Sequence, residues 1–583
     1  MSVDHPLRVA LVGTPSHPEV EWNDASLTRL RALGFNAVQL NIAWSYRPDD
    51  EVLNLEDVIA IPGAPEPLAG QGRRGNGERR ARLTARARLA RRHGFRTILH
   101  VGIPFQGRAG FDGAPLPQCI SDPGVTDRYE KALSLLAQAI PEIDDILVYT
   151  YDQDAWLCSE FGGCDRCLGV PLHERLPRFL NGLGEAWNRS RPNGRVWWEP
   201  WELSSGQALA CVPRLDPSRL GVMVHNTIGE VISTRPADAF VRNLATAAAS
   251  RGLPVVVEIF LSSSNEEVEP WTHLPVPLVT IEQLRAVDRV VGVSGVKEYF
   301  GLRLDEFDVN LNAAAAYFRA PNRTDGELLD DVAALFGEKW LPRFWTLASE
   351  AYSLYPWDAS WFGRQLGRSQ PVHETTAATV RGAQTSASAW DTPAWRSSRH
   401  AVFMRTDNGE PHPWLLEDVG LRCSQAADRM TDALAVFDRE PWVDRAEHLE
   451  THLQLQRLQA LGFVTRTRAY AFHIRETLLA CVLRSEPRPF LRDELRRTLE
   501  ADLANQEREV LRLAEVEALG APEISEVAGL QATEKWVVQT RTDLDGIKDA
   551  LSTLTRSLPE YLATYSLAVP GVARAGQFSL TSR

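Results

Sequence analysis

The chain has 583 residues, of which 44% are hydrophobic and 24% are charged, with a formal net charge of −13. This composition indicates a globular protein with a large core and suggests about two to four domains. The acidic balance argues against a nucleic-acid-binding protein, which normally carries a basic stripe, so we expect no nucleic-acid partner.

One unit recurs in the first half of the chain: a helical stretch, a glycine, an aromatic or apolar residue, and then a β-rich apolar run. Examples are LRALGFNAVQLNIAW (30–44), ARRHGFRTILHVGIPF (90–105) and SRGLPVVVEIF (250–260). Glycine can end a helix in the left-handed conformation, and a strand can follow after a short loop. The repeat therefore predicts alternating helices and strands.

Eight apolar runs have the length of a strand. They span residues 7–13, 37–44, 97–105, 145–151, 195–201, 220–226, 254–260 and 289–295. Their almost continuous hydrophobicity is typical of parallel strands that are buried on both faces. Eight such units within about 300 residues favour an α/β fold of the (β/α)8 (TIM) barrel type, assigned to residues 1–310. An open doubly wound sheet is the alternative, although no G-x-G-x-x-G follows the first strand.

An arginine-rich stretch, residues 73–94, lies between the second and third predicted strands. Such a stretch can bind nucleic acid when aromatic residues are interleaved with the arginines. No aromatic residues are interleaved here, and the whole chain is acidic. We interpret the stretch as the solvated face of a barrel helix.

The second half of the chain has a different pattern of apolar residues. Residues 311–364 read as helices attached to the barrel, and residues 365–412 are rich in Ser, Thr, Ala and Gly, which indicates a loop or linker. From residue 413 to 583, and clearly in stretches such as LETHLQLQRLQALGF, apolar residues recur with helical spacing. This pattern predicts a C-terminal helical domain, which is a possible surface for a homodimer.

The N-terminal stretch MSVDHPLRVALVGTP has neither a basic region nor a small-residue cleavage site, unlike a secretion signal. No apolar run reaches the roughly 18 residues of a membrane span, so we expect no membrane partner. The seven cysteines are an odd number, and Cys119, Cys211, Cys423 and Cys481 lie far apart, unlike a secreted disulfide framework. We therefore expect a cytoplasmic protein with mostly reduced thiols.

In a (β/α)8 barrel the functional side chains lie at the C-terminal ends of the strands. In this chain those positions are rich in carboxylates, tryptophans, histidines and amides. Sugar rings stack their C–H faces on indoles, while their hydroxyls bond to carboxylates and amides. Glycoside hydrolysis needs one protonated and one ionised carboxyl group across the scissile bond. The residue types at the strand ends therefore indicate a carbohydrate substrate.

Four carboxylates are the candidate catalytic groups. Asp152 and Asp154 are two residues apart on an extended segment, so they face the same side, and their repulsion would raise one pKa. We predict Asp154 as the general acid, with Asp152 tuning its pKa or binding a hydroxyl. Glu258, within a buried apolar run, is predicted as nucleophile or base, with Glu267 as the reserve base. The alternatives are a helix cap for the aspartates and a structural ion pair for Glu258.

The remaining strand-end residues are predicted to bind the sugar. The aromatic platform would consist of Trp44, Trp156, Trp198 and Trp201, although any one tryptophan can instead be a core residue. The other predicted contacts are His100, Tyr151, Glu199, Glu202, His225, Asn226, Glu298 and Tyr299. His100 and His225 can equally be core histidines with satisfied hydrogen bonds.

Three cysteines follow the fourth predicted strand closely. Cys158, Cys164 and Cys167 form C-x5-C-x2-C, and His173 follows six residues later. Three thiolates and an imidazole can close a tetrahedral structural zinc site. The alternatives are a compact loop of packed thiols or one labile disulfide. We expect no catalytic metal and no cofactor, because thiolate-rich sites tend to be closed and structural.

The middle of the chain resembles glycoside hydrolase (β/α)8 barrels related to families 20 and 123 and α-glucuronidase-like barrels. The segments that carry the resemblance are QCISDPGVTDRYEKALSLLAQAIPEIDDILVYTYDQDAWLCSEFGGCDRC, RLPRFLNGL and RVWWEPWELSSGQ. In those barrels the fourth strand delivers acidic residues, a cysteine-bearing loop follows, and a Trp-rich fifth strand lines the sugar pocket. The resemblance, over roughly residues 115–305, implies a glycosidase with Asp152 and Asp154 at the acidic position.

These observations together predict a glycoside hydrolase that is exo-acting on short oligosaccharides or glycosides. Two other functions stay open: a β-N-acetylhexosaminidase that uses the acetamido group of its substrate as nucleophile, and a non-catalytic carbohydrate-binding barrel. Against the hexosaminidase, this chain departs from the family 20 pattern: it has Asp152-Gln153-Asp154 where that family has an adjacent Asp-Glu pair.

Overall fold

The computed structural model describes residues 6–14, 18–42, 51–61, 75–106, 116–150, 155–200, 203–225, 237–261, 274–299, 301–357, 413–440, 447–519 and 534–565. The chain divides into two compact units. The first comprises Met1–Leu261, Ile281–Glu306 and Ala314–Asn322, and the second comprises the rest. Among the described helices, none combines the length and the apolarity that a bilayer span requires.

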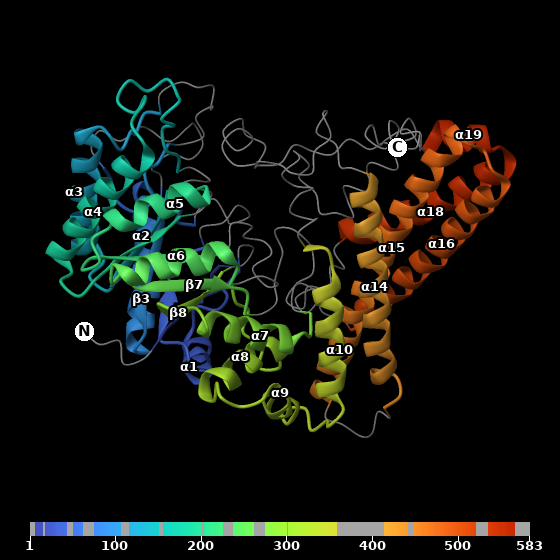
Figure 1. Cartoon of the computed structure of the whole chain (residues 1–583). Coiled ribbons are helices and arrows are strands. Elements are labelled where there is room, and N and C mark those ends of the chain that lie inside the picture. The colour runs from blue at the N-terminus through green and yellow to red at the C-terminus, as the bar shows by residue number, and fades with distance from the viewer. Residues whose placement is uncertain are drawn as a thin grey trace. The chain divides into compact units, whose positions relative to one another are not determined.

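The first unit is built on a closed barrel of eight parallel strands, which Figure 1 colours from blue to green. The strands are β1 (Leu7–Leu11), β2 (Ala37–Gln39), β3 (Arg96–Gly102), β4 (Asp145–Tyr149), β5 (Val196–Glu199), β6 (Leu220–Val224), β7 (Val255–Ile259) and β8 (Val293–Glu298). Each strand pairs with its successor, and β8 closes the barrel on β1. The predicted (β/α)8 barrel is confirmed, and the open doubly wound alternative is wrong.

One predicted strand was misplaced. The apolar run 289–295 suggested that the eighth strand ends at Gly295, whereas β8 starts at Val293 and continues to Glu298. The first residues of the run form a turn instead, because Gly292 adopts a left-handed backbone with φ of 91° and Val291 is exposed. The shift brings Lys297 and Glu298 into the strand itself.

Helices separate the strands. They are α1 (Asp24–Leu33), α2 (Asn76–Arg92), α3 (Pro123–Ala139), α4 (Leu172–Ser190), α5 (Ser205–Cys211), α6 (Ala239–Ser250), α7 (Pro277–Asp288) and, after β8, α8 (Val309–Arg319). Local signals set their ends: the side chain of Asn23 caps the start of α1, and Gly34, with φ of 99°, ends it. Short 3-10 helices, η1 (Leu55–Asp57) and η2 (Val212–Arg214), complete this unit.

The arginine-rich stretch forms α2, as predicted. Most of its arginines lie at least partly exposed, but Arg86 is buried. Its Nη1 atom lies 2.6 Å from Oε1 of Glu51, which is also buried. A buried guanidinium needs such a partner, because an unpaired buried charge is costly. One arginine of this stretch therefore anchors the helix on the barrel.

The inward-facing residues of the strands form two layers of opposite character. One residue from each of β1 to β7 joins a single buried apolar cluster, whose members are Val9, Ala37, Ile98, Leu147, Trp197, Met223 and Val256. Side chains along a strand alternate between faces, so the residue two positions further on also faces inward. Those residues are mostly polar: Leu11, Gln39, His100, Tyr149, Glu199, His225 and Glu258, with Lys297 on β8. The apolar layer is thus followed by a polar layer near the C-terminal ends of the strands.

The apolar layer depends on a glycine beside its largest member. A β-carbon at Gly221 would lie 2.4 Å from Cζ3 of Trp197. We therefore expect Gly221→Ala to lower the free energy of unfolding by about 1–3 kcal/mol, the usual cost of overpacking a core. Urea unfolding measures this change. The matched control is Gly206→Ala in α5, where an added β-carbon meets nothing within 4 Å; equal destabilisation of both variants would contradict the packing argument.

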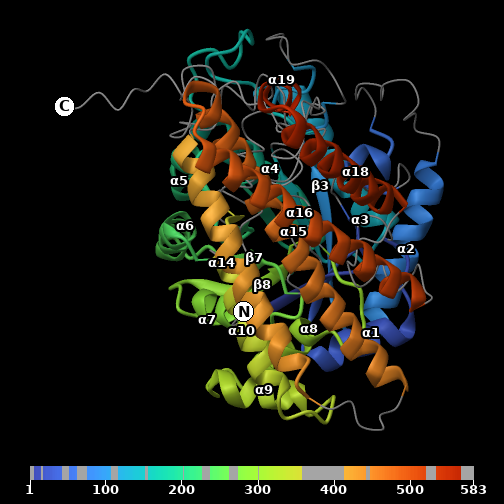
Figure 2. The ribbon, with the colours of Figure 1, turned by 90° about the vertical axis from the view of Figure 1, so that its right-hand side faces the viewer.

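The second unit is mostly helical, and Figure 2 shows its long helices side by side. Its further helices are α9 (Asp325–Ala333), α10 (Leu341–Leu354), α14 (Pro413–Phe437), α15 (Glu447–Ser485), α16 (Pro489–Ala518), α18 (Glu534–Arg556) and α19 (Leu558–Tyr565). Helix α14 packs against α10 and α15, and α16 packs against α15 and α18. The predicted C-terminal helical domain is confirmed. Of the predicted linker, residues 365–412, all lie outside the described residues.

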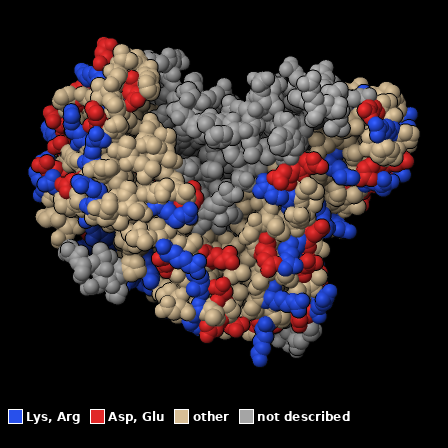
Figure 3. Space-filling view, viewed as in Figure 1, with Lys and Arg blue, Asp and Glu red and all other residues tan. Residues whose placement is uncertain are grey.

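Charged side chains of both signs are interspersed on the face of the molecule that Figure 3 shows. Many of the described pairs are surface ion pairs, such as Arg189 with Glu130 at 3.0 Å. Exposed pairs of this kind contribute little stability each, but they keep the surface polar.

Candidate active site

The polar layer of the barrel is the candidate site. It brings two glutamates, Glu199 at the end of β5 and Glu258 in β7, close to His225, the residue that follows β6. One side-chain donor atom from each of the three lies within 4.8 Å of the others. Both carboxylates have no exposed surface. The sequence placed all three at strand ends, and the structure brings them together.

Glu199 on β5 contacts a histidine on β3, two strands away. Its Oε2 atom lies 3.0 Å from Nε2 of His100, and its Oε1 atom lies 3.9 Å from Nε2 of His225. Burial raises the pKa of Glu199 to about 7, while the positive charge of Lys297 opposes the rise. The protonated and ionised forms of this carboxyl group are therefore both populated near neutral pH.

Glu258 forms a buried ion pair with Lys297. The Nζ atom of Lys297 lies 3.0 Å from Oε1 of Glu258, and neither side chain is exposed. Burial and the neighbouring charge of Glu199 raise the pKa of Glu258, whereas Lys297 lowers it. The net effect raises the pKa of Glu258 above its usual value, because two carboxylates this close disfavour each other's ionisation. The ammonium group of Lys297 is the contact that favours the ionised form of Glu258.

His100 is held neutral and oriented by its surroundings. Burial lowers the pKa of His100 to about 3, and the charge of Lys297 acts in the same direction. Its backbone N–H donates to Oδ1 of Asn41 at 3.0 Å, and Asn41 donates back to the carbonyl of His100 at 2.8 Å. The ring nitrogen Nδ1 lies 3.4 Å from Nε2 of Gln39. A neutral imidazole in a fixed orientation can exchange a hydrogen bond with Glu199 without taking its proton.

Two of the predicted sugar contacts, Glu298 and Tyr299, make contacts within the protein beside the polar layer. The carboxylate of Glu298 accepts hydrogen bonds from the backbone N–H groups of Leu261, at 2.7 Å, and Gly301, at 3.4 Å. The buried ring of Tyr299 packs edge-on against His225, with ring centroids 5.3 Å apart. These contacts fix the chain just after β7 and β8.

The two described tryptophans of the predicted platform are buried. Trp198 has no exposed surface, and its Nε1 donates to Oγ1 of Thr150 at 3.2 Å. It follows Trp197, whose ring lies in the inward-facing apolar cluster, so alternation turns Trp198 outward, toward the helices. Trp156 is 8% exposed. The position of Trp198 favours a structural role for that residue.

Eight predicted site residues lie outside the described residues and stay predictions. They are Trp44, Tyr151, Asp152, Asp154, Trp201, Glu202, Asn226 and Glu267.

Three residues of the polar layer were missing from the predicted site. They are Gln39, Tyr149 and Lys297, and each stands two positions after an inward-facing residue of the same strand. Tyr149 packs against His100 with ring centroids 5.1 Å apart. The signal that could have found them is the alternation along each strand, counted from the apolar layer, rather than the polarity of the strand ends.

Two groups of side chains carry donor atoms at a spacing that suits a metal ion: Glu199, His225 and Glu258 in the barrel, and a group of four cysteines. In the barrel group, the ammonium of Lys297 lies against Glu258 and supplies the positive charge that a cation would bring. This charge balance favours an acid–base pair over a metal site there. His173, the fourth ligand that the sequence suggested, is not a member of the cysteine group.

No protein-family model and no curated protein matches the sequence. Similar proteins are found among the solved structures. A family GH138 enzyme that targets pectin rhamnogalacturonan II is similar with a TM-score of 0.52 and 14% identity, over 95% of this chain and 69% of that chain. An endo-glycoceramidase II from Rhodococcus sp. has a TM-score of 0.35 and 14% identity, over 53% of this chain and 78% of that one. The GH20 modules of a pneumococcal exo-β-D-N-acetylglucosaminidase have a TM-score of 0.33 and 11% identity, with coverages of 60% and 92%.

The similarity to the GH138 enzyme establishes the fold. The chain has a (β/α)8 barrel, the fold that the sequence predicted, and it shares this fold with the GH138 enzyme. Fold alone does not define an activity, because barrels host many chemistries. The side chains of the polar layer, rather than the fold, therefore indicate the function.

Proposed function

We propose that the protein is a glycoside hydrolase whose two catalytic carboxyl groups are those of Glu199 and Glu258. The observation that carries this proposal is the close approach of two buried carboxylates at the C-terminal end of the barrel strands. Active sites of (β/α)8 barrels lie at this end. A carboxyl pair with unequal charge environments is the chemical requirement for cleaving a glycosidic bond.

The two glutamates have different tasks because their neighbours differ. Glu199, with a pKa of about 7, is the general acid that protonates the leaving-group oxygen. Glu258, paired with the ammonium of Lys297, is the ionised group that attacks the anomeric carbon. The neutral imidazole of His100, 3.0 Å from Glu199, orients the proton donor.

The spacing of the pair favours retention of configuration. The facing donor atoms of Glu199 and Glu258 lie within 4.8 Å, and retaining glycosidases hold their carboxyl groups about 5–5.5 Å apart, against about 6.5–9.5 Å in inverting ones. In the first step Glu258 forms an ester bond to the anomeric carbon, the bond to the leaving group breaks, and Glu199 gives up its proton. Water then cleaves the ester, and Glu199 takes the proton back.

The finer features of the function are also part of this proposal. We propose exo-action on short oligosaccharides or glycosides, with Asp154 as the alternative general acid, Asp152 as its partner and Glu267 as a reserve base. The GH138 enzyme with a similar fold targets pectin rhamnogalacturonan II, which supports a polysaccharide-derived substrate.

A panel of aryl glycosides tests the function. The panel contains α and β anomers of neutral, acetamido and uronic sugars. We expect turnover of at least one member, and we expect proton NMR of the first product to show the same anomeric configuration as the substrate. An acetamido-specific thiazoline inhibitor then tests the hexosaminidase alternative, which predicts strong inhibition.

Two outcomes would contradict the proposal. A first product of inverted configuration would exclude Glu258 as the nucleophile, although the protein would still be a glycosidase. Absence of turnover across the panel, with sugars that raise the melting temperature, would favour a carbohydrate-binding barrel without catalysis.

A further inference from the structure

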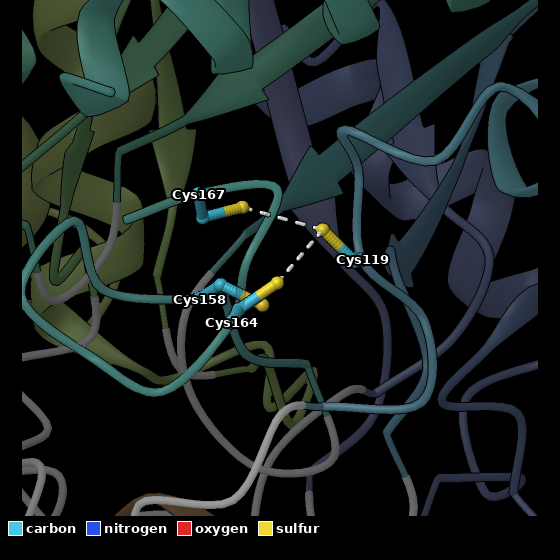
Figure 4. Close-up of side chains that lie close together, drawn as sticks. All are labelled: Cys119, Cys158, Cys164 and Cys167. Carbon is cyan, nitrogen blue, oxygen red and sulfur yellow. Dashed lines mark hydrogen bonds between the residues drawn. The ribbon is translucent and has the colours of Figure 1, made fainter. Parts of the chain in front are cut away.

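Four cysteines from two separate segments meet beside the barrel (Figure 4). Cys119 comes from the segment before α3, and Cys158, Cys164 and Cys167 come from the segment between β4 and α4. All four are buried, and none forms a disulfide. Their Sγ atoms all lie within 4.8 Å of one another.

The spacing of the sulfur atoms suits a tetrahedral metal ion. The Sγ atom of Cys119 lies 3.3 Å from that of Cys167 and 3.7 Å from that of Cys164. Zinc–sulfur bonds of about 2.3 Å place the sulfurs of a tetrahedral site about 3.8 Å apart. Figure 4 shows the thiols of Cys119, Cys164 and Cys167 directed toward one another rather than into separate parts of the core.

The backbone turn around Cys164 and Cys167 presents both sulfurs to the same side. The carbonyl of Cys164 accepts hydrogen bonds from the N–H groups of Cys167 and Leu168, each at 2.9 Å. Gly169 follows with φ of 71°, a left-handed conformation that a residue with a side chain rarely adopts. This turn lets two cysteines separated by two residues bind one ion.

A buried cation completes the surroundings. Arg175 is 6% exposed, and its Nη1 donates to Sγ of Cys167 at 3.1 Å. Its other guanidinium nitrogens donate to the carbonyls of Cys158, at 3.0 Å, and Val170, at 2.9 Å. Four thiolates around Zn²⁺ carry a net charge of −2, and an N–H donor to a ligand sulfur is a common outer-shell partner. Arg175 offsets part of that charge and holds the ligand loop in place.

We propose that Cys119, Cys158, Cys164 and Cys167 bind one structural Zn²⁺ ion. The ligand set differs from the one that the sequence suggested, because Cys119 takes the place of His173. The ion joins the segment before α3 to the segment after β4, and Arg166 and Asp122 bridge the same two segments with an ion pair at 3.2 Å. With four protein ligands the site is closed, so the ion has no open position for a substrate.

The metal content of the full-length protein tests this proposal. The protein is produced in zinc-supplemented medium, purified without chelator and analysed by mass spectrometry of its metals. We expect about one zinc per chain. Stepwise modification of the thiols with a mercurial should release the zinc in parallel, which gives a readout that needs no variant. Replacement by Co²⁺ should give the absorption of a tetrahedral tetrathiolate complex.

Matched cysteine variants identify the ligands. Cys119→Ser should lose most of the zinc and lower the melting temperature. Cys211→Ser, which removes a buried thiol outside the cluster, should keep the full zinc content.

Three results would overturn the proposal. The first is wild-type protein without stoichiometric zinc, and the second is stoichiometric iron in place of zinc. The third is a count of fewer than the seven thiols of the sequence after denaturation in chelator, because the missing thiols would indicate disulfides. Full zinc retention by folded Cys119→Ser would remove Cys119 from the ligand set.

Discussion

Glu258→Ala should lower kcat on the best aryl glycoside by at least on the order of 10³-fold, because it removes the group that forms the covalent intermediate. Steady-state kinetics beside the wild type measures the loss. Azide should restore part of the activity, since the small anion fits the space of the missing carboxylate and attacks the anomeric carbon itself. The product would then be a glycosyl azide of inverted configuration, an outcome that a purely structural role for Glu258 does not produce.

The ion pair with Lys297 supplies the comparison for this experiment. Lys297→Met keeps the carboxylate of Glu258 but removes the cation that lowers its pKa. Because the nucleophile must be ionised, activity of this variant should begin only at a higher pH than in the wild type. A Glu258→Ala protein that stays folded and keeps wild-type kcat would end the nucleophile assignment and would reduce the pair to a structural ion pair.

Glu199→Gln should remove the alkaline limb of the pH–rate profile. In the wild type the acid must be protonated, and its pKa is about 7, so kcat/KM should fall as the pH rises above about 7. The variant has no proton to lose in this range, and its rate should no longer fall there. The loss in kcat should be on the order of 10²–10⁴-fold for poor leaving groups and much smaller for activated phenols, which need no protonation.

Asp154→Asn is the companion variant, because Asp154 is the alternative proton donor. If Asp154→Asn abolishes the alkaline limb while Glu199→Gln keeps it, Asp154 is the acid and Glu199 a buried partner of His100. If both variants keep the limb, neither carboxylate is the general acid.

The barrel could be predicted from sequence because each strand is a compact apolar run between a glycine-ended helix and a polar segment. The eighth strand was misplaced because hydrophobicity alone does not distinguish the turn around Gly292 from a strand. This error also affects the predicted site. The predicted strand ends before Lys297, so the sequence does not indicate that Lys297 pairs with Glu258.

Residue types at the strand ends drew attention to Glu258, Glu199, His100 and His225, which the structure brings together, but they did not indicate which of these residues contact one another. The sequence predicts Glu199 as a sugar contact between Trp198 and Trp201 and does not indicate its proximity to His100, because sequence shows neighbours along the chain and not between strands. The sequence does not group Cys119 with Cys158 for the same reason, since only the fold brings the two cysteines together. Distances between strands depend on register and closure, which no short motif encodes.

The apolar layer and the polar layer of the barrel interior lie only two residues apart on each strand. Changes in the apolar layer act on folding, whereas Glu199, Glu258 and Lys297 are held in the interior at an energetic cost that the rest of the fold must offset. A lineage that lost its substrate would gain stability by replacing those charges with apolar residues. Under the proposed function, these three buried charges serve the chemistry of the barrel and not its stability.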